Sequence, residues 1–310
     1  MGFKSMMNNY FYGKQGQADF TVADLPANRF QLFGAVLKVR WSGLVGVNLL
    51  YMAIWIPAIV WTVMNVVLMN GMLMDENTSY ANADYLNVIS MWLLVMFPCI
   101  GITGPFNAGV TYVLRNWARD QHSFVLSDFW DAVKGNWKQA LPVSLISGAI
   151  PFLLFIGIQY YTEMARTTAV FLLPVAVMVV AAAVWTMMTM VIYPMMVTYE
   201  LKLGDIIRNA LLLTIGKLPF AVLFKALTLA LPLLAFGLAQ LLPGASQYIM
   251  LVLVVLYCFF MPAFNKLITV SYANWLCETF MNSRIEGAAT NIGLRPENWD
   301  DTEYRPEDDE

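Results

Sequence analysis

The sequence predicts an all-α, polytopic membrane protein with six transmembrane helices, and three observations lead to this fold class. Hydrophobic residues make up 59% of the 310 residues and charged residues only 13%. Soluble domains are about 45–50% apolar and about 25% charged. Several apolar runs exceed the roughly 20 residues that a helix needs to cross a bilayer. Basic residues also gather in alternate loops between these runs, as they do in multi-pass membrane proteins.

The first two spans are expected after a polar beginning. Residues 1–27 lack the apolar core of a signal peptide and are interpreted as a cytoplasmic N-terminal arm. Asn28 opens an expected amphipathic helix at the membrane interface, which ends near Arg40. Residues 41–69 and 86–114 are charge-free runs, so each is long enough for one tilted span.

Four further spans complete the predicted membrane domain, which covers residues 28–283. They are expected at 140–161, 169–199, 218–242 and 246–275. From 284 onward the chain is rich in acidic residues, so 284–310 is interpreted as a disordered acidic cytoplasmic tail.

The distribution of basic residues predicts the orientation. The segment before the first span and the second-to-third and fourth-to-fifth loops are basic, whereas the three opposite loops contain only Arg166. The positive-inside rule then places both termini in the cytoplasm. We therefore expect a multi-pass protein of the cell membrane, with the lipid bilayer as its immediate partner.

A recurring pattern suggests three copies of one unit. Val110-Thr111-Tyr112, Val197-Thr198-Tyr199 and Val270-Ser271-Tyr272 each follow a proline near the end of an even-numbered span. Asp128 and Asp205 each lie 14 residues before a proline that begins a span. These matches predict repeats at about 28–115, 127–202 and 204–276, each an elbow helix followed by a helical hairpin. The alternative is that similar span ends arose without a repeat.

The second elbow helix, residues 128–141, is expected to lie in the interface. Ser127 and Asp128 are suitable caps for its beginning. One predicted face, placed at the headgroup boundary, carries Phe129, Trp130, Val133, Trp137 and Leu141; the other carries Asp131, Lys134 and Lys138.

Prolines are frequent in or at the start of the predicted spans. A proline inside a span frees a backbone carbonyl, which a neighbouring side chain or water must satisfy. Two interpretations are open: broken helices around a cavity, or kinks that the packing tolerates.

Three polar residues inside the spans are candidate ligand contacts. Lys225 is either a functional charge at depth or a side chain that extends to the cytoplasmic headgroups. Asn107 and Asn265 either link helices through hydrogen bonds or bind a polar ligand.

The sequence offers no catalytic constellation. One histidine, no carboxylate within the spans and no phosphate-binding loop argue against a metalloprotease, an acid–base pair or an ATPase. The three cysteines have neither disulfide nor zinc-site spacing. We expect a protein that is not an enzyme, with no cofactor, no metal and no nucleic-acid partner.

Residues 104–142 read GPFNAGVTYVLRNWARDQHSFVLSDFWDAVKGNWKQALP. This segment resembles the central signature of the YesL-like membrane proteins, a bacterial family of unknown function. The shared positions are Gly104-Pro105, Ala108-Gly109, Tyr112, Arg115, Phe129 and Asn136-Trp137-Lys138-Gln139. Because members often lie beside genes for carbohydrate ABC importers, the resemblance implies an accessory role and makes Arg115, Asn136, Trp137 and Lys138 candidate partner contacts.

Two functions from different classes remain open. The first is a non-catalytic accessory or regulatory membrane protein that associates with the permease subunits of a bacterial carbohydrate ABC importer. The alternative is a stand-alone transporter of a small molecule or lipid, with a central cavity between the repeats. The sequence gives no ligand, partner identity or oligomeric state.

Overall fold

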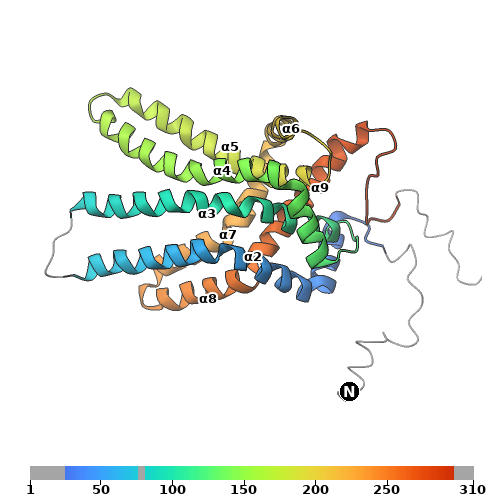
Figure 1. Cartoon of the computed structure of the whole chain (residues 1–310), viewed down its shortest axis with the longest axis horizontal. Helices are drawn as coiled ribbons and strands as arrows, with labels where there is room; N and C mark the ends of the chain where they lie inside the picture. Colours follow the sequence, from blue (N-terminus) through green and yellow to red (C-terminus); the bar gives the residue numbers. More distant parts are fainter. Residues whose placement is uncertain (1–24, 76–80, 297–310) are drawn as a thin grey trace, which may run out of the picture.

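The computed structural model describes residues 25–75 and 81–296, whose regular secondary structure is entirely helical (Figure 1). In chain order the helices are α2 (Arg29–Met74), α3 (Asn82–Trp117), α4 (Val125–Ala165), α5 (Leu172–Met196), α6 (Leu203–Gly216), α7 (Leu218–Leu241), α8 (Ser246–Phe259) and α9 (Met261–Phe280). Most of the N-terminal arm and residues 297–310 of the acidic tail lie outside the described residues.

Three helical hairpins give the bundle its shape. Figure 1 shows α2–α3, α4–α5 and α7–α8 extending toward the left and spreading apart, while the chain converges at the right. The two ends of the described chain meet at the right, where the backbone N–H of Arg295 donates to the carbonyl of Pro26 at 3.0 Å. Both ends of the described chain therefore lie at one end of the bundle, which an even number of crossings produces.

The helices are long and apolar enough for a multi-pass membrane protein. Five described helices meet this condition: α2, α3, α4, α7, and α5 together with the short turn η2 (Ala169–Phe171) before it. The bent pair α8–α9 makes a sixth if it is counted as one span. The expected all-α, multi-pass class is confirmed, and the sixth span differs from expectation because it is not continuous.

The first helix begins and bends where the sequence predicts. Asn28 caps α2, and its side-chain oxygen accepts the backbone N–H of Gln31 at 2.9 Å. Within α2, Arg40 leaves helical geometry (φ −104°, ψ 16°), next to the start of the charge-free run. The bend separates an amphipathic first part from the span.

The second elbow differs from the prediction in three respects. It is continuous with the third span, because α4 runs from Val125 without a break through Pro142. The helix begins after Phe124, and the Asp128 carboxylate reaches back to accept the Phe124 backbone N–H at 2.9 Å. Phe129 is 1% exposed and lies in the protein core rather than at the headgroup boundary.

Phe129 reaches the core because α3 presents a glycine to it. A Cβ atom on Gly109 would lie 2.6 Å from the Phe129 ring, so no larger residue fits there without movement. Trp130 and Trp137, on the same predicted face, remain 46% and 48% exposed. Val133 of that face is also buried, so the two tryptophans are its exposed members at a membrane boundary.

Helices α3 and α4 approach closely through small residues. A Cβ on Gly104 would lie 2.1 Å from Ser144 Oγ, and one on Gly148 would lie 2.6 Å from the Phe97 carbonyl oxygen. On α4, Ala140, Ser144 and Gly148 recur every fourth residue and form the facing stripe. Such stripes let membrane helices pack backbone to backbone, where dispersion and hydrogen bonds hold them together.

Polar side chains on neighbouring helices satisfy carbonyls that prolines leave free. A proline cannot donate to the carbonyl four residues earlier. Pro105 thereby frees Gly101, whose oxygen accepts Ser144 Oγ at 2.5 Å, and Pro232 frees Thr228, whose oxygen accepts Asn265 Nδ2 at 3.2 Å. At both sites, therefore, the packing tolerates a kink at the proline, which is the second of the two interpretations of the prolines.

The break between α8 and α9 is the third case. The two segments are bent by 61° at Phe260, two residues before Pro262. Asn48 of α2 is fully buried, and its Nδ2 donates to the carbonyls of Tyr257 at 3.1 Å and Cys258 at 2.8 Å. Its Oδ1 accepts the backbone N–H of Ala263 at 2.9 Å. One amide thus replaces the hydrogen bonds that the break removes.

Candidate functional site

A polar cavity of about 240 Å³ lies where the three hairpins converge. Five helices contribute to it, and each supplies at least one group that can form a hydrogen bond or carry charge. The lining residues are Tyr51 of α2; Asn107 of α3; Thr189, Met190 and Tyr193 of α5; Lys225 and Thr228 of α7; and Pro262, Asn265, Lys266 and Thr269 of α9. The cavity therefore joins all three hairpins.

The cavity lies within the membrane spans. Lys225 is about 12 Å along α7 from Lys217, which precedes the helix, at 1.5 Å per residue. Asn107 is about 15 Å from Trp117 at the end of α3 by the same rise. Both residues therefore lie well inside spans that cross a bilayer core of about 30 Å, whereas Tyr193 lies three residues from the end of α5.

Two lysines give this cavity its charge. Lys225 and Lys266 both line it, and the Lys266 ammonium lies 5.0 Å from the centre of the Tyr193 ring. None of the lining residues is acidic, and in the described part of the chain neither ammonium is ion-paired. Lys225, for which two alternatives were open, is thus one of the residues that line the cavity.

The two candidate asparagines meet at the same place but make different contacts. Asn265 uses its amide nitrogen to link α9 to α7 through the Thr228 carbonyl. The Asn107 Oδ1 is buried and has no hydrogen-bond donor among the described residues. Asn265 thus has a structural role in this arrangement, whereas Asn107 has an acceptor to offer to a ligand.

The other four candidate residues, Arg115, Asn136, Trp137 and Lys138, lie outside this cavity, nearer the end of the bundle where the two ends of the described chain meet. The Arg115 guanidinium donates to the Val197 carbonyl at 3.0 Å and lies 4.7 Å from the Tyr112 ring centre, which ties α3 to the end of α5. Asn136 donates to the Ala132 carbonyl of its own helix at 2.9 Å.

A groove of about 420 Å³ lies beside these residues. Its walls come from the end of α3, the first turns of α4 and the end of α5 with the residues after it. The lining residues are Tyr112, Asp128, Asp131, Ala132, Asn136, Met196, Val197, Thr198, Tyr199 and Glu200. Trp137 and Lys138, one turn along α4, are exposed next to it, and the Lys138 ammonium lies 5.9 Å from the Trp137 ring centre.

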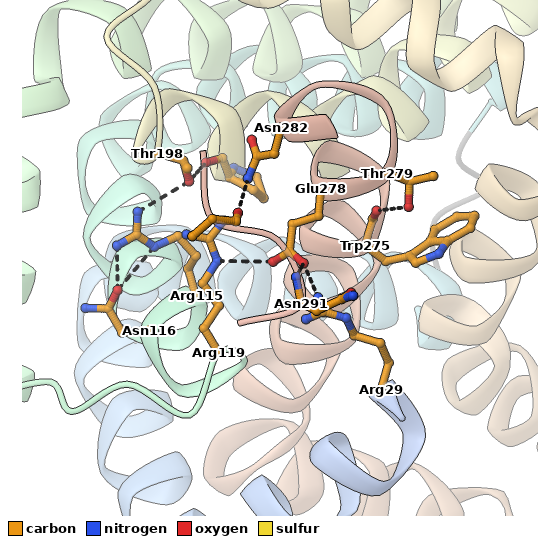
Figure 2. Close-up of polar contacts among 12 residues, drawn as sticks. Arg29, Arg115, Asn116, Arg119, Thr198, Trp275, Glu278, Thr279, Asn282 and Asn291 are labelled. Carbon is orange, nitrogen blue, oxygen red and sulfur yellow. Dashed lines mark hydrogen bonds and ion pairs between the residues drawn. The ribbon is translucent and has the colours of Figure 1, made fainter. Parts of the chain in front are cut away.

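A buried charge cluster closes the convergent end (Figure 2). Glu278 of α9 is 4% exposed and pairs with Arg29 at the beginning of α2, while Arg119 after α3 lies 3.9 Å from its other oxygen. Glu278 also accepts the backbone N–H of Asn291 at 2.9 Å. The start of the acidic tail, expected to be disordered, thus packs against the bundle as far as residue 296.

The same segment is held at a second point. Asn282 donates from Nδ2 to the Ala289 carbonyl at 2.9 Å, and its Oδ1 accepts the Tyr199 hydroxyl at 2.6 Å. Burial raises the pKa of the Tyr199 phenol, so the hydroxyl keeps the proton that it donates. These contacts fasten residues after α9 to the residues that follow α5.

Sequence reasoning did not select Lys266 or Glu278 as site residues. Lys266 falls inside the expected sixth span, 246–275, and it lines the cavity from α9, after the break at Phe260. The usable signal was the Asn265-Lys266 pair, three and four residues after Pro262, because a proline there predicts a break. The signal for Asn48 was an amide side chain inside an apolar run, because such side chains commonly form hydrogen bonds between helices.

The long apolar helices define the class of protein, a multi-pass helical membrane protein with an open, partly polar cavity between its hairpins. Residues 84–158 match the model of a family described as "Protein of unknown function, DUF624". The matched residues comprise nearly all of α3 and most of α4, the two helices that pack through glycine, alanine and serine. No curated protein matches the chain, and no solved structure does.

Proposed function

We propose that this chain is a bacterial, YesL-like protein of the cell membrane with both termini in the cytoplasm. The family match over 84–158 contains the whole segment, residues 104–142, that resembles the YesL-like signature. The two ends of the described chain lie together, at the end of the bundle that carries the basic loops. By the positive-inside rule this end is cytoplasmic.

The three hairpins are, in this proposal, copies of one unit. Each follows an elbow: the first part of α2, the first part of α4, and α6. Thr111 and Thr198, at matching positions of two motifs, both donate to the carbonyl four residues earlier, at 2.6 Å. Equivalent local contacts at equivalent positions support a repeat, as does the convergence of all three hairpins on one cavity.

The function that the geometry supports best is transport of a small polar molecule through a non-catalytic membrane protein. The single observation that carries it is the cavity between the spans, lined by amide, hydroxyl and ammonium groups from all three hairpins. Transporters built from repeats hold their substrates near the bilayer midplane at the repeat interface, beside discontinuous helices. The broken α8–α9 pair, with Pro262 in the lining, is such a helix.

Thermal stabilisation followed by uptake tests this function. Purified protein is heated with a panel of monosaccharides, sugar phosphates and small organic acids, and the best stabiliser is then offered to proteoliposomes. We expect saturable uptake that falls at least about tenfold in Asn107→Leu, because a buried polar contact to a ligand is worth about one factor of ten or more.

Asn136→Leu is the matched control. It also removes one amide, but that amide bonds within its own helix and lies outside the cavity. Equal uptake by Asn107→Leu and the wild type would show that the transported molecule does not pass through the cavity. No uptake of any stabiliser by the wild type would reject transport itself.

The second candidate is the accessory subunit of a carbohydrate ABC importer. The specific observation in its favour is the groove beside α4, which is partly acidic and flanked by exposed Trp137 and Lys138. Exposed aromatics next to a groove are typical of partner contacts. Co-purification of importer permease subunits with the wild type, and their loss in Trp137→Ala, would support this role over transport.

A further inference from the structure

We infer that the cavity between the hairpins takes the anionic group, a phosphate or a carboxylate, of a small polar molecule. The inference rests on the proposed function and narrows its substrate to a charge class. It depends on three features of the lining: two lysines without acidic partners, a buried acceptor without a donor, and the available volume.

The charge balance points to an anion. Lys225 and Lys266 approach from different helices, α7 and α9, and the lining contains no Asp or Glu. The three ion pairs in the described part of the chain involve neither lysine. Two like charges inside membrane spans are costly unless a counter-charge is present. An anion between the ammonium groups supplies that counter-charge.

Lys266 is not arranged for escape to the membrane surface. The Lys266 ammonium lies over the Tyr193 ring, whose hydroxyl-bearing side chain also lines the cavity. This contact holds the charge on the inner side of α9, facing α5. Charged side chains within membrane helices that face the bundle interior mark substrate or ion paths.

The Asn107 amide adds a second element of recognition. Its Oδ1 is buried and lacks a donor, so the site has an acceptor that neither lysine occupies. A ligand hydroxyl or N–H group would satisfy it, because an unpaired buried acceptor is unfavourable. The ligand that fits both features carries an anionic group and a hydroxyl or amine on one small molecule.

The volume limits the size of that molecule. About 240 Å³ equals the space of about eight liquid water molecules at about 30 Å³ each. A glycerol phosphate, a hexose phosphate or a short hydroxy acid fits this space. A phospholipid headgroup offers the same phosphate chemistry, so the experiment must separate the soluble source from the lipid source.

The test uses the full chain in nanodiscs of phosphatidylcholine, in phosphate-free buffer of constant ionic strength. Thermal unfolding is followed while glycerol 3-phosphate or glucose 6-phosphate is titrated, with glycerol and glucose as neutral counterparts. We expect saturable stabilisation by the phosphates alone. Lys225→Gln and Lys266→Gln should each weaken the apparent affinity about tenfold or more, since each removes one charge-assisted contact.

Two variants control for charge and folding. Lys134→Gln removes an exposed lysine of α4, outside the cavity, and should respond as the wild type does. Lys266→Arg keeps the positive charge and should retain the stabilisation even if the double Gln variant does not fold. A second experiment uses nanodiscs of phosphatidylglycerol to detect a lipid source of the phosphate. If the lipid is the source, these nanodiscs stabilise the wild type and soluble phosphates add no further stabilisation.

The outcomes separate this inference from the proposed function. Stabilisation by glucose or glycerol that equals that of the phosphates, unchanged in the lysine variants, would overturn the anionic class and leave a cavity for polar molecules. Absence of stabilisation by every soluble probe and by the anionic lipid would overturn the inference together with the cavity's role in binding.

Discussion

Replacing Asn48 with leucine should destabilise the protein more than replacing a buried asparagine whose hydrogen bond stays within its own helix. The side chain is fully buried on α2 and makes three hydrogen bonds to the backbone around the α8–α9 break. Leucine is similar in size, so it removes the hydrogen bonds without opening a large cavity. At about 0.6 kcal/mol for each bond within a membrane bundle, the expected loss is about 2 kcal/mol.

The assay is thermal unfolding of the full chain in one detergent. A loss of about 2 kcal/mol corresponds to a fall in Tm of about 4–8 °C for a domain of this size. Asn65→Leu is the matched control, because Asn65 is also a buried amide of α2 but bonds to the Trp61 carbonyl of its own helix at 2.8 Å. The control should shift Tm much less.

A double variant tests the cause. Pro262→Ala supplies a backbone N–H that can reach the Cys258 carbonyl, one of the groups that Asn48 satisfies. It should therefore recover part of the stability lost in Asn48→Leu. Equal Tm values for Asn48→Leu and Asn65→Leu, or no recovery in the double variant, would refute the assignment of Asn48 as the residue that satisfies the break.

Three further predictions concern topology, packing and the charge cluster. In a cysteine-free background, Thr168→Cys should react with an impermeant thiol reagent on intact cells and Lys134→Cys should not; the reverse pattern would invert the proposed orientation. Gly104→Val should lower the yield of folded protein because its side chain meets α4, whereas Gly135→Val, with open space around it, should not; equal yields would disprove the close helix contact. Glu278→Gln should lower the free energy of unfolding by about 3 kcal/mol or more, because two arginines lose their counter-charge. An unchanged Tm at pH 7 would show that the cluster does not contribute to stability.

The spans could be predicted from sequence because each depends on a local property. A charge-free run of sufficient length is a helix in a bilayer whatever surrounds it. The cap at Asn28 and the bend at Arg40 are equally local, since they depend on residue types within one turn.

The failures depend on contacts between distant parts of the chain. Phe129 was placed at the headgroup boundary because its helix is amphipathic, but Gly109 of another helix admits it to the core. The sixth span was expected to be continuous because residues 248–264 form an unbroken apolar run. Whether Pro262 bends a helix or breaks it depends on which neighbour can satisfy the freed groups, here Asn48.

The candidate site shows the same division. Lys225, Asn107 and Asn265 were selected because polar residues inside apolar runs are conspicuous in a sequence. That the three meet in one cavity, and that Lys266 joins them, depends on the depth and rotation of three separate helices. Neither quantity follows from the periodicity of one helix.

The contacts that join α2 to α9 also have a consequence for biosynthesis. Arg29 pairs with a residue 249 positions later, and Asn48 accepts from a residue 215 positions later. During translation the first hairpin enters the membrane long before α9 leaves the ribosome, so both side chains must wait without their final partners. The bundle can close only when the last helix arrives, and until then the nascent chain is the form most exposed to quality-control proteases.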